Sequence, residues 1–164
     1  MQVSFCIIIP ARYDSTRLPG KPLLDIKGKS LLQHVFDTAT NTQAKSITIA
    51  TDDTRIADSA KSFGASVIMT SEEHESGTDR IAEAINLLEI GDEEVVVNLQ
   101  GDEYGLPAAL INQVASNLYS RPERQVSTLC EAISDLDDYL DPNIVKVIFD
   151  KFSDAVYFSR SPIP

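Results

Sequence analysis

The segment FCIIIPARYDSTRLPGK (residues 5–21) passes from an apolar run into a loop that carries three cationic side chains. The run from Val3 to Ile9 is typical of a buried strand in a parallel sheet, and Pro10 ends it. The cations that follow are Arg12, Arg17 and Lys21. Because arginine and lysine side chains that converge on one point bind phosphate oxygens, we expect this loop to hold the phosphates of a nucleotide. A solvated basic loop is the alternative.

The composition, with 43% hydrophobic and 24% charged residues, favours a single globular domain over residues 1–164. The formal net charge of −11 argues against general binding to nucleic acid or to anionic membranes, although a local cluster of cations can bind a small anion. Cys6 and Cys130 are expected to be buried hydrophobic residues of a protein from a reducing compartment. There is no basic leader, and no apolar run approaches the roughly 18 residues that span a membrane, so we expect a cytoplasmic protein.

Short β-branched runs alternate with helical patterns along most of the chain. Ser30 is a suitable N-cap for one helix, and Gly64 fits the position after the end of another. The predicted strands are 3–9, 46–50, 66–69 and 95–99, and the predicted helices are 31–41, 54–63, 79–88 and 107–118. This order predicts a three-layer α/β fold, in which helices cover both faces of a mostly parallel sheet.

The C-terminal part of the chain follows another pattern. We expect a strand at 126–133, an acidic turn or short helix at 134–142, and two further strands at 144–149 and 155–159. The last two strands are predicted to form a β-hairpin that extends the sheet and is not a second domain. The sequence stops at SPIP without a closing element, so we expect the chain to be truncated and the full-length protein to be longer.

Polar side chains follow three of the predicted strands, at Arg12–Lys21, Thr51–Asp53 and Gln100–Glu103. Ligands of open α/β sheets bind beyond the carboxyl ends of the strands, so we expect these segments to converge on one site.

Two common phosphate-binding motifs are excluded. Gly28-Lys29-Ser30 resembles the end of a Walker A loop, but Leu23 stands where the first glycine is needed. No GxGxxG motif is present, which argues against a dinucleotide site. Lys27 and Lys29 are therefore expected to lie in a surface turn.

Six blocks of the sequence are similar, in this order, to one known family: ARYDSTRLPGKPL at 11–23, ATDD at 50–53, HESGTDR at 74–80, NLQGDE at 98–103, PNIVKV at 142–147 and YFSRSPIP at 157–164. Together they resemble the 3-deoxy-D-manno-octulosonate (KDO) cytidylyltransferases, or CMP-KDO synthetases, over the whole chain. The resemblance implies a Rossmann-like nucleotide-diphospho-sugar transferase fold. It also implies an enzyme that transfers CMP from CTP to KDO, releases pyrophosphate, uses Mg²⁺ and serves lipopolysaccharide biosynthesis, as a homodimer in the full-length protein.

The resemblance also assigns roles to individual residues. Nucleotide contacts fall on Ala11, Arg12, Ser15, Arg17, Lys21, His74, Ser76, Gly77, Arg80, Gln100 and Gly101, and contacts to KDO fall on Gln100, Tyr157 and Arg160. Asp102, just past a central strand, would bind Mg²⁺ and act catalytically together with Arg12, Arg17 and Lys21. The anomeric hydroxyl of KDO would attack the α-phosphate of CTP in line, without a covalent enzyme intermediate.

Alternatives remain for several of these assignments. Residues 74–80 also fit turn and N-cap chemistry, Asp52 and Asp53 fit the cap of the following helix, and Arg160 can be a surface arginine. Tyr104-Gly105 departs from the family, which has proline after Asp-Glu, and this predicts an altered or more mobile acceptor side.

Family members continue beyond the position that matches Pro164, and they carry a second Mg²⁺-binding aspartate in that further part. The alternative functions are a CMP-sialic acid synthetase-like enzyme and a non-catalytic nucleotide-binding fragment.

Overall fold

The structure is a computed structural model of the chain and describes residues 3–14 and 18–163. The chain divides into two compact units, residues 1–127 and residues 128–164, and each is described by itself. The single domain expected over residues 1–164 stays a prediction. None of the helices in the described ranges has the length and apolar character needed to cross a membrane.

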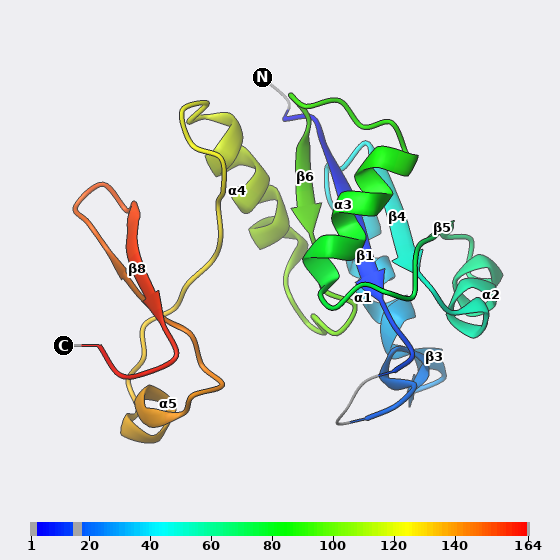
Figure 1. The fold of residues 1–164 in the computed structure, drawn as a ribbon, viewed down its shortest axis with the longest axis horizontal. Coiled ribbons are helices and arrows are strands. Elements are labelled where there is room, and N and C mark those ends of the chain that lie inside the picture. The colour runs from blue at the N-terminus through cyan, green and yellow to red at the C-terminus, as the bar shows by residue number, and fades with distance from the viewer. Residues whose placement is uncertain (1–2, 15–17, 164) are drawn as a thin grey trace. The chain divides into compact units, whose positions relative to one another are not determined.

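A four-stranded parallel sheet forms the centre of the first unit (Figure 1). Its strands are β1 (Phe5–Ala11), β4 (Ser46–Thr51), β5 (Ser66–Met69) and β6 (Val95–Asn98), in the order β5-β4-β1-β6. Ile7 of β1 lies opposite Ile47 of β4 on one side and Val97 of β6 on the other. The carboxyl ends of these strands therefore lie at one edge of the sheet, where the polar segments begin.

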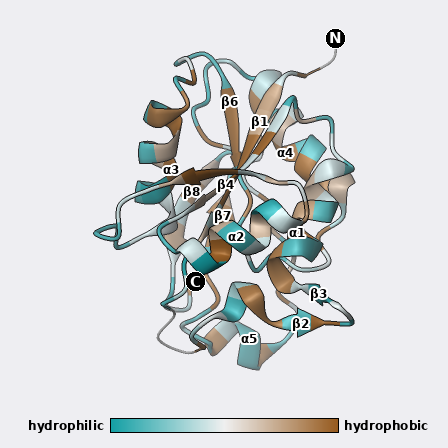
Figure 2. Cartoon of the chain, turned by 90° about the vertical axis from the view of Figure 1, so that its right-hand side faces the viewer, coloured by the Kyte–Doolittle hydropathy of each residue, from teal (hydrophilic) through white to brown (hydrophobic). Residues whose placement is uncertain are grey.

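Helices cover both faces of this sheet, and they are α1 (Leu31–Thr40), α2 (Thr54–Ser62), α3 (Gly77–Leu87) and α4 (Ala108–Tyr119). Successive side chains of a strand point to opposite faces. Ile7 and Ile9 accordingly pack with residues of α1, α2 and α4. Ile8 packs with Ile81 and Ala84 of α3. Most of β1 and β6 has the hydrophobic colour in Figure 2. The predicted three-layer α/β fold is confirmed.

The helix ends follow local rules in the sequence. Ser30 Oγ accepts a hydrogen bond from Gln33 N at 3.1 Å and so caps α1. Asp53 caps α2 by accepting from Arg55 N at 2.8 Å. Gly64 follows α2 with φ +84°, a left-handed conformation that suits glycine. The predicted strands and helices of this unit agree with the observed ones to within two residues at each end.

Three short elements connect β1 to α1: the 3₁₀ helix η1 (Lys21–Leu23) and the strands β2 (Asp25–Ile26) and β3 (Lys29–Ser30). The turn between β2 and β3 is formed by Lys27 and Gly28, whose φ angles are 54° and 85°. The sequence pattern does not predict the two strands. Lys27 lies in the expected surface turn, whereas Lys29 lies on β3 and forms an ion pair with Asp37 at 2.6 Å.

The second unit contains α5 (Leu136–Leu140) and an antiparallel hairpin of β7 (Lys146–Phe149) and β8 (Ala155–Ser159). The predicted acidic helix and the predicted hairpin are therefore confirmed. Within the described residues β7 and β8 form a two-stranded sheet of their own. The extension of the parallel sheet by this hairpin stays a prediction.

The strand predicted at 126–133 is not formed. Val126 is 82% exposed, and no strand of the described chain pairs with this segment. A β-branched run forms a strand only when a neighbouring backbone is available to pair with it, and the local sequence does not reveal that neighbour. Cys130 in this segment is exposed, contrary to our expectation, whereas Cys6 in β1 is buried as expected.

Candidate functional site

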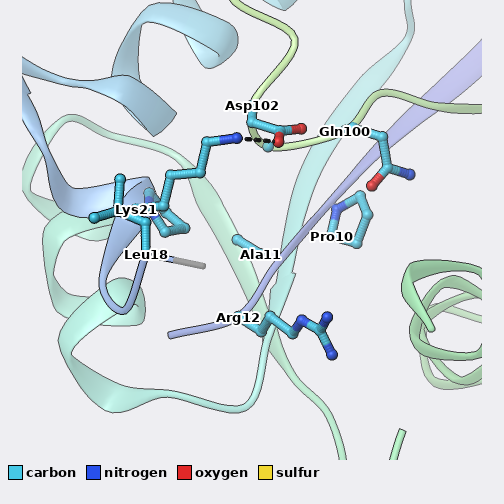
Figure 3. Close-up of a pocket in the computed structure, with 9 residues that line it drawn as sticks. Pro10, Ala11, Arg12, Leu18, Lys21, Gln100 and Asp102 are labelled. Atoms are coloured by element: carbon cyan, nitrogen blue, oxygen red, sulfur yellow. Dashed lines mark hydrogen bonds and ion pairs between the residues drawn. The ribbon is translucent and has the colours of Figure 1, made fainter. Parts of the chain in front are cut away.

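A cleft of about 570 Å³ lies beyond the carboxyl ends of β1 and β6 (Figure 3). This volume is typical of a site for a small ligand. The cleft is lined by residues of the cationic segment after β1 (12–21) and of the segment after β6 (100–103). Two of the three predicted polar segments therefore contribute to one site. The lining residues are Pro10, Ala11, Arg12, Leu18, Lys21, Pro22, Gln100, Gly101 and Asp102.

An ion pair between Lys21 and Asp102 connects the two sides of the cleft (Figure 3). Lys21 begins η1, and Asp102 lies in the turn after β6. Their side chains are 40% and 49% exposed. An ion pair so open to water contributes only about 0–1 kcal/mol. A phosphate group or a metal ion can therefore replace either partner at little energetic cost.

Arg12 is exposed at the cleft, and its side chain points away from Lys21 and Asp102 (Figure 3). It forms no ion pair with any residue in the described ranges. Its guanidinium is therefore available to an anionic ligand. The predicted contacts of Ser15 and Arg17 lie outside the described residues.

Tyr13, to which no sequence pattern pointed, is bonded to Gly20 at the other end of the loop. Gly20 N donates a hydrogen bond to Tyr13 O at 2.8 Å. The Arg55 guanidinium lies over the Tyr13 ring, 3.3 Å from its centroid, and Arg55 Nε donates to Asp53 Oδ1 at 3.0 Å. The hydrogen bond from the Arg55 side chain lowers the pKa of the Asp53 carboxyl, which keeps this pair charged. The cationic segment is thus fastened to α2 by a contact between residues distant in the sequence.

Close backbone packing forms part of the cleft wall. A Cβ on Gly101 would lie 3.0 Å from Pro10 O, so glycine allows the loop after β6 to pass against β1. This gives Gly101 a packing role, and its approach to a ligand stays a prediction. Gln100 Nε2 donates to Asn98 Oδ1 at 2.6 Å. A Cβ on Gly77 would lie 3.4 Å from Gln100 Oε1, so the start of α3 adjoins this part of the cleft.

The segment that leads into α3 has its own hydrogen bonds. His74 Nε2 lies 2.6 Å from Glu83 Oε2, which also accepts from Ser71 N at 2.8 Å. The bond from Ser71 N and then the bond with His74 lower the pKa of the Glu83 carboxyl. Ser76 Oγ accepts from Asp79 N at 3.1 Å and caps α3, so the N-cap alternative is confirmed for Ser76. Nucleotide contacts of His74 and Ser76 stay predictions.

Arg80 is buried, with 3% of its side chain exposed, and its hydrogen bonds stay inside the protein. Nη2 donates to the Asp52 carboxylate, and Nη1 donates to the Thr70 hydroxyl and to Ser71 O at 3.3 Å. These contacts join α3 to the ends of β4 and β5. The segment Thr51–Asp53 is thus turned to Arg80 and does not line the cleft. The geometry gives Arg80 a structural role, and a contact to the nucleotide stays a prediction without support from it.

Tyr104, where the chain departs from the family pattern, packs edge-on against His34 of α1, with 5.2 Å between the ring centroids. Tyr104 N donates to Asp102 O at 2.8 Å. His34 itself is bonded to Ile26 O at 2.8 Å, in line with the structural role expected for it. The turn at Asp102 is therefore linked to α1 by an aromatic contact.

The two predicted sugar contacts, Tyr157 and Arg160, belong to the second unit. Tyr157 on β8 is 58% exposed. Arg160 Nη1 donates to Pro142 O at 2.9 Å. Lys146, on β7, is buried beside Arg160, and no sequence pattern pointed to it because its acceptors are backbone carbonyls.

The cleft offers one carboxylate, which suits a divalent metal ion that is also bound by the phosphates of a nucleotide. Asp102 is the carboxylate among the lining residues. Within the described residues no group of three or more histidine, cysteine, aspartate or glutamate side chains could hold a metal ion. Mg²⁺ is commonly bound by one or two carboxylates together with substrate phosphates, so Asp102 meets this requirement in part and phosphates would complete it.

Comparison with known proteins identifies relatives of this chain. A family described as Cytidylyltransferase matches residues 6–164. The 3-deoxy-manno-octulosonate cytidylyltransferase of Hahella chejuensis is 56% identical over 98% of this chain and 63% of that protein, and its namesake from Cellvibrio japonicus is 54% identical over 99% and 64%. A solved structure of a CMP:2-keto-3-deoxy-manno-octonic acid synthetase complexed with CTP has a TM-score of 0.90 and 42% identity, over 98% of this chain and 65% of that one. The chain spans less than two thirds of the length of these relatives.

Proposed function

The chain belongs to the cytidylyltransferase family, and on this premise we propose that the full-length protein transfers CMP from CTP to KDO, with release of pyrophosphate. The observation that supports this proposal is the cleft beyond β1 and β6, whose lining residues include Lys21, Arg12 and Asp102. Cations suit a triphosphate, and a carboxylate suits the metal ion that accompanies it. The names of the relatives, and the CTP in the related structure, support the two substrates.

In the proposed reaction the anomeric hydroxyl of KDO attacks the α-phosphorus of CTP in line. A bond from the sugar oxygen to phosphorus forms, the bond to the β-phosphate oxygen breaks, and the hydroxyl proton is released. Lys21 and Arg12, together with Arg17, neutralise the charge that grows on the departing pyrophosphate. Asp102 would hold Mg²⁺, which supplies further charge neutralisation to the phosphates when it is bound.

The remaining residues are proposed to orient the substrates. Gln100 and Gly101 line the cleft, and Gly77 at the start of α3 lies next to Gln100. These three residues and Ser76 are proposed to contact the cytidine. Tyr157 and Arg160 are proposed to contact KDO. The homodimer, the cytoplasmic location and the role in lipopolysaccharide biosynthesis form part of the same proposal.

Pyrophosphate release by the full-length protein tests this function. Release should require CTP, KDO and Mg²⁺ together. Asp102→Asn should reduce kcat/KM by about 10²–10³-fold, the usual effect of losing one group that stabilises transition-state charge. Asp37→Asn, which removes an exposed carboxylate from the comparable Lys29 ion pair, should leave the rate unchanged.

Three other outcomes would change the proposal. Turnover of sialic acid without turnover of KDO would assign the protein to the alternative sugar. Binding of CTP without any release of pyrophosphate would indicate a nucleotide-binding protein. Equal rates for Asp102→Asn and Asp37→Asn would remove Asp102 from the reaction.

A further inference from the structure

Lys146 on β7 is a buried cation in the second unit, with 3% of the residue exposed. Its Nζ donates to Asp141 O at 2.5 Å, to Ile144 O at 2.9 Å and to Arg160 O at 3.0 Å. These three acceptors match the three N–H donors of an ammonium group. The Asp141 carboxylate instead accepts from Asn143 N and Nδ2, both at 2.8 Å.

A gain in folding stability does not explain a buried lysine at this position. Burying an ammonium is costly, and a methionine of similar shape would fill the same space without an uncompensated charge. Among the described residues no carboxylate forms an ion pair with Lys146. The ammonium is therefore held by backbone carbonyls, one of which belongs to Arg160.

Arg160 is fixed to the same turn at two points. Its carbonyl oxygen is held by Lys146 Nζ at 3.0 Å. Its Nη1 donates to Pro142 O at 2.9 Å and, more weakly, to Asn143 O at 3.4 Å. The two cations thus bind the carbonyls of four consecutive residues, 141–144, and fix the backbone of Arg160 against this turn.

One edge of the Arg160 guanidinium stays open. Nε and Nη2 form no hydrogen bond with residues 3–14 and 18–163, and the residue is exposed. These two N–H donors lie side by side in the rigid fork that binds a carboxylate in a bidentate manner. Because Nη1 is tied to the turn, the direction of the free edge is set before a ligand arrives.

We propose that Lys146 is a positioning residue that holds Arg160 so that its Nε and Nη2 edge binds the carboxylate of the acceptor sugar. This inference rests on the proposed function for the identity of that carboxylate. Lys146 acts through Arg160 and makes no contact with the sugar itself. It therefore governs affinity for the acceptor and not affinity for the nucleotide.

Steady-state kinetics of the full-length protein, with KDO and CTP varied separately, test this inference. Lys146→Met should raise KM for KDO about tenfold, the usual effect of losing a hydrogen bond to a charged group, and should change KM for CTP by less than about twofold. Lys151→Met, which removes an exposed lysine from the β7–β8 turn, should change neither value. Lys146→Gln keeps donors for two of the three carbonyls, so its KM for KDO should lie between those of the wild type and Lys146→Met. It also serves if Lys146→Met fails to fold, which thermal unfolding would show.

A double-mutant cycle separates positioning from a general loss of structure. Arg160→Lys keeps a cation but removes the fork, and it should raise KM for KDO. If Lys146 acts through Arg160, the double variant should be no worse than Arg160→Lys alone. Additive effects, an equal rise of KM for CTP, or a Lys146→Gln variant indistinguishable from wild type would overturn the inference. A wild-type protein that turns over no KDO would overturn the proposed function, and this inference with it.

Discussion

Two segments of the first unit, residues 18–21 and residues 74–80, each carry a cation near the carboxyl edge of the parallel sheet, yet the surroundings of the two cations differ. In the first segment Lys21 is 40% exposed and shares an open ion pair with Asp102. In the second segment Arg80 is 3% exposed and donates to Asp52, Thr70 and Ser71 O. A cation near the end of a strand can therefore stay open to solvent or be used by the fold itself, and burial distinguishes the two.

The difference has an energetic basis. An exposed ion pair is weak, so Lys21 and Asp102 can exchange each other for a phosphate and a metal ion without weakening the fold. A buried pair is costly to separate, because the remaining charge would lose both its partner and water. Arg80 is therefore not expected to leave Asp52 for a nucleotide.

The largest expected effect is on stability. Arg80→Met should lower the free energy of unfolding by about 3–5 kcal/mol, because it leaves the Asp52 carboxylate partly buried without its partner. Denaturant unfolding measures this value. Arg55→Met is the matched control, because Arg55 is 58% exposed in its pair with Asp53 and its loss should destabilise the protein much less. Equal losses of stability in the two variants would show that burial does not determine how much an arginine ion pair contributes to the fold.

The second prediction concerns the exposed ion pair between Lys21 and Asp102. Lys21→Met should raise KM for CTP about tenfold, as the loss of one charged hydrogen bond to phosphate would, while the free energy of unfolding changes by about 1 kcal/mol or less. Lys29→Met is a close control, because Lys29 and Asp37 are 48% and 41% exposed, against 40% and 49% for Lys21 and Asp102. If the two lysine variants bound CTP equally well, the cleft would not be the phosphate site.

The sequence was sufficient for the parts of the fold that local patterns control. Apolar runs such as CIII in β1, and the caps at Ser30 and Asp53, act over a few residues, so the elements of the first unit were predicted closely. The meeting of Arg12 and Lys21 with residues of the segment Gln100–Glu103 in one cleft was also predictable, because ligand sites of parallel sheets lie at the carboxyl ends of the strands. The cleft was predictable for this topological reason.

The features that the sequence did not reveal have a common cause, which is dependence on distant partners. Residues 126–133 have β-branched composition but no strand beside them in the described chain. The roles of Arg80 and Lys146 are decided by acceptors that only the folded chain brings together. The stacking of Arg55 on Tyr13 likewise joins residues far apart in the sequence. A charge in a sequence does not show whether it will be buried.

The third prediction concerns the close packing of the loop after β6 against β1. Gly101→Ala should destabilise the protein by about 1–3 kcal/mol, because its Cβ would press on the backbone oxygen of Pro10 and force the chain to shift. Gly91→Ala should cost nothing, since a Cβ there meets no atom within 4 Å. Urea unfolding of the two variants gives the comparison. Equal stability would mean that the loop after β6 can yield without effect on β1.

The smallest expected effect belongs to Glu83, which joins residues 71 and 74 to α3. Because its hydrogen bonds lower the folded-state pKa of this carboxyl below the ordinary value of 4.5, they contribute stability that is fully present above that value and is lost as the pH falls through the folded-state pKa. The stability difference between wild type and Glu83→Gln should therefore shrink between about pH 5 and about pH 3. Glu72→Gln, an exposed neighbour, should show no such trend in thermal unfolding at each pH. A Glu83 difference that persists undiminished at the acid end would mean that the Ser71 and His74 bonds do not depend on the carboxylate charge, and that this segment is held by geometry alone.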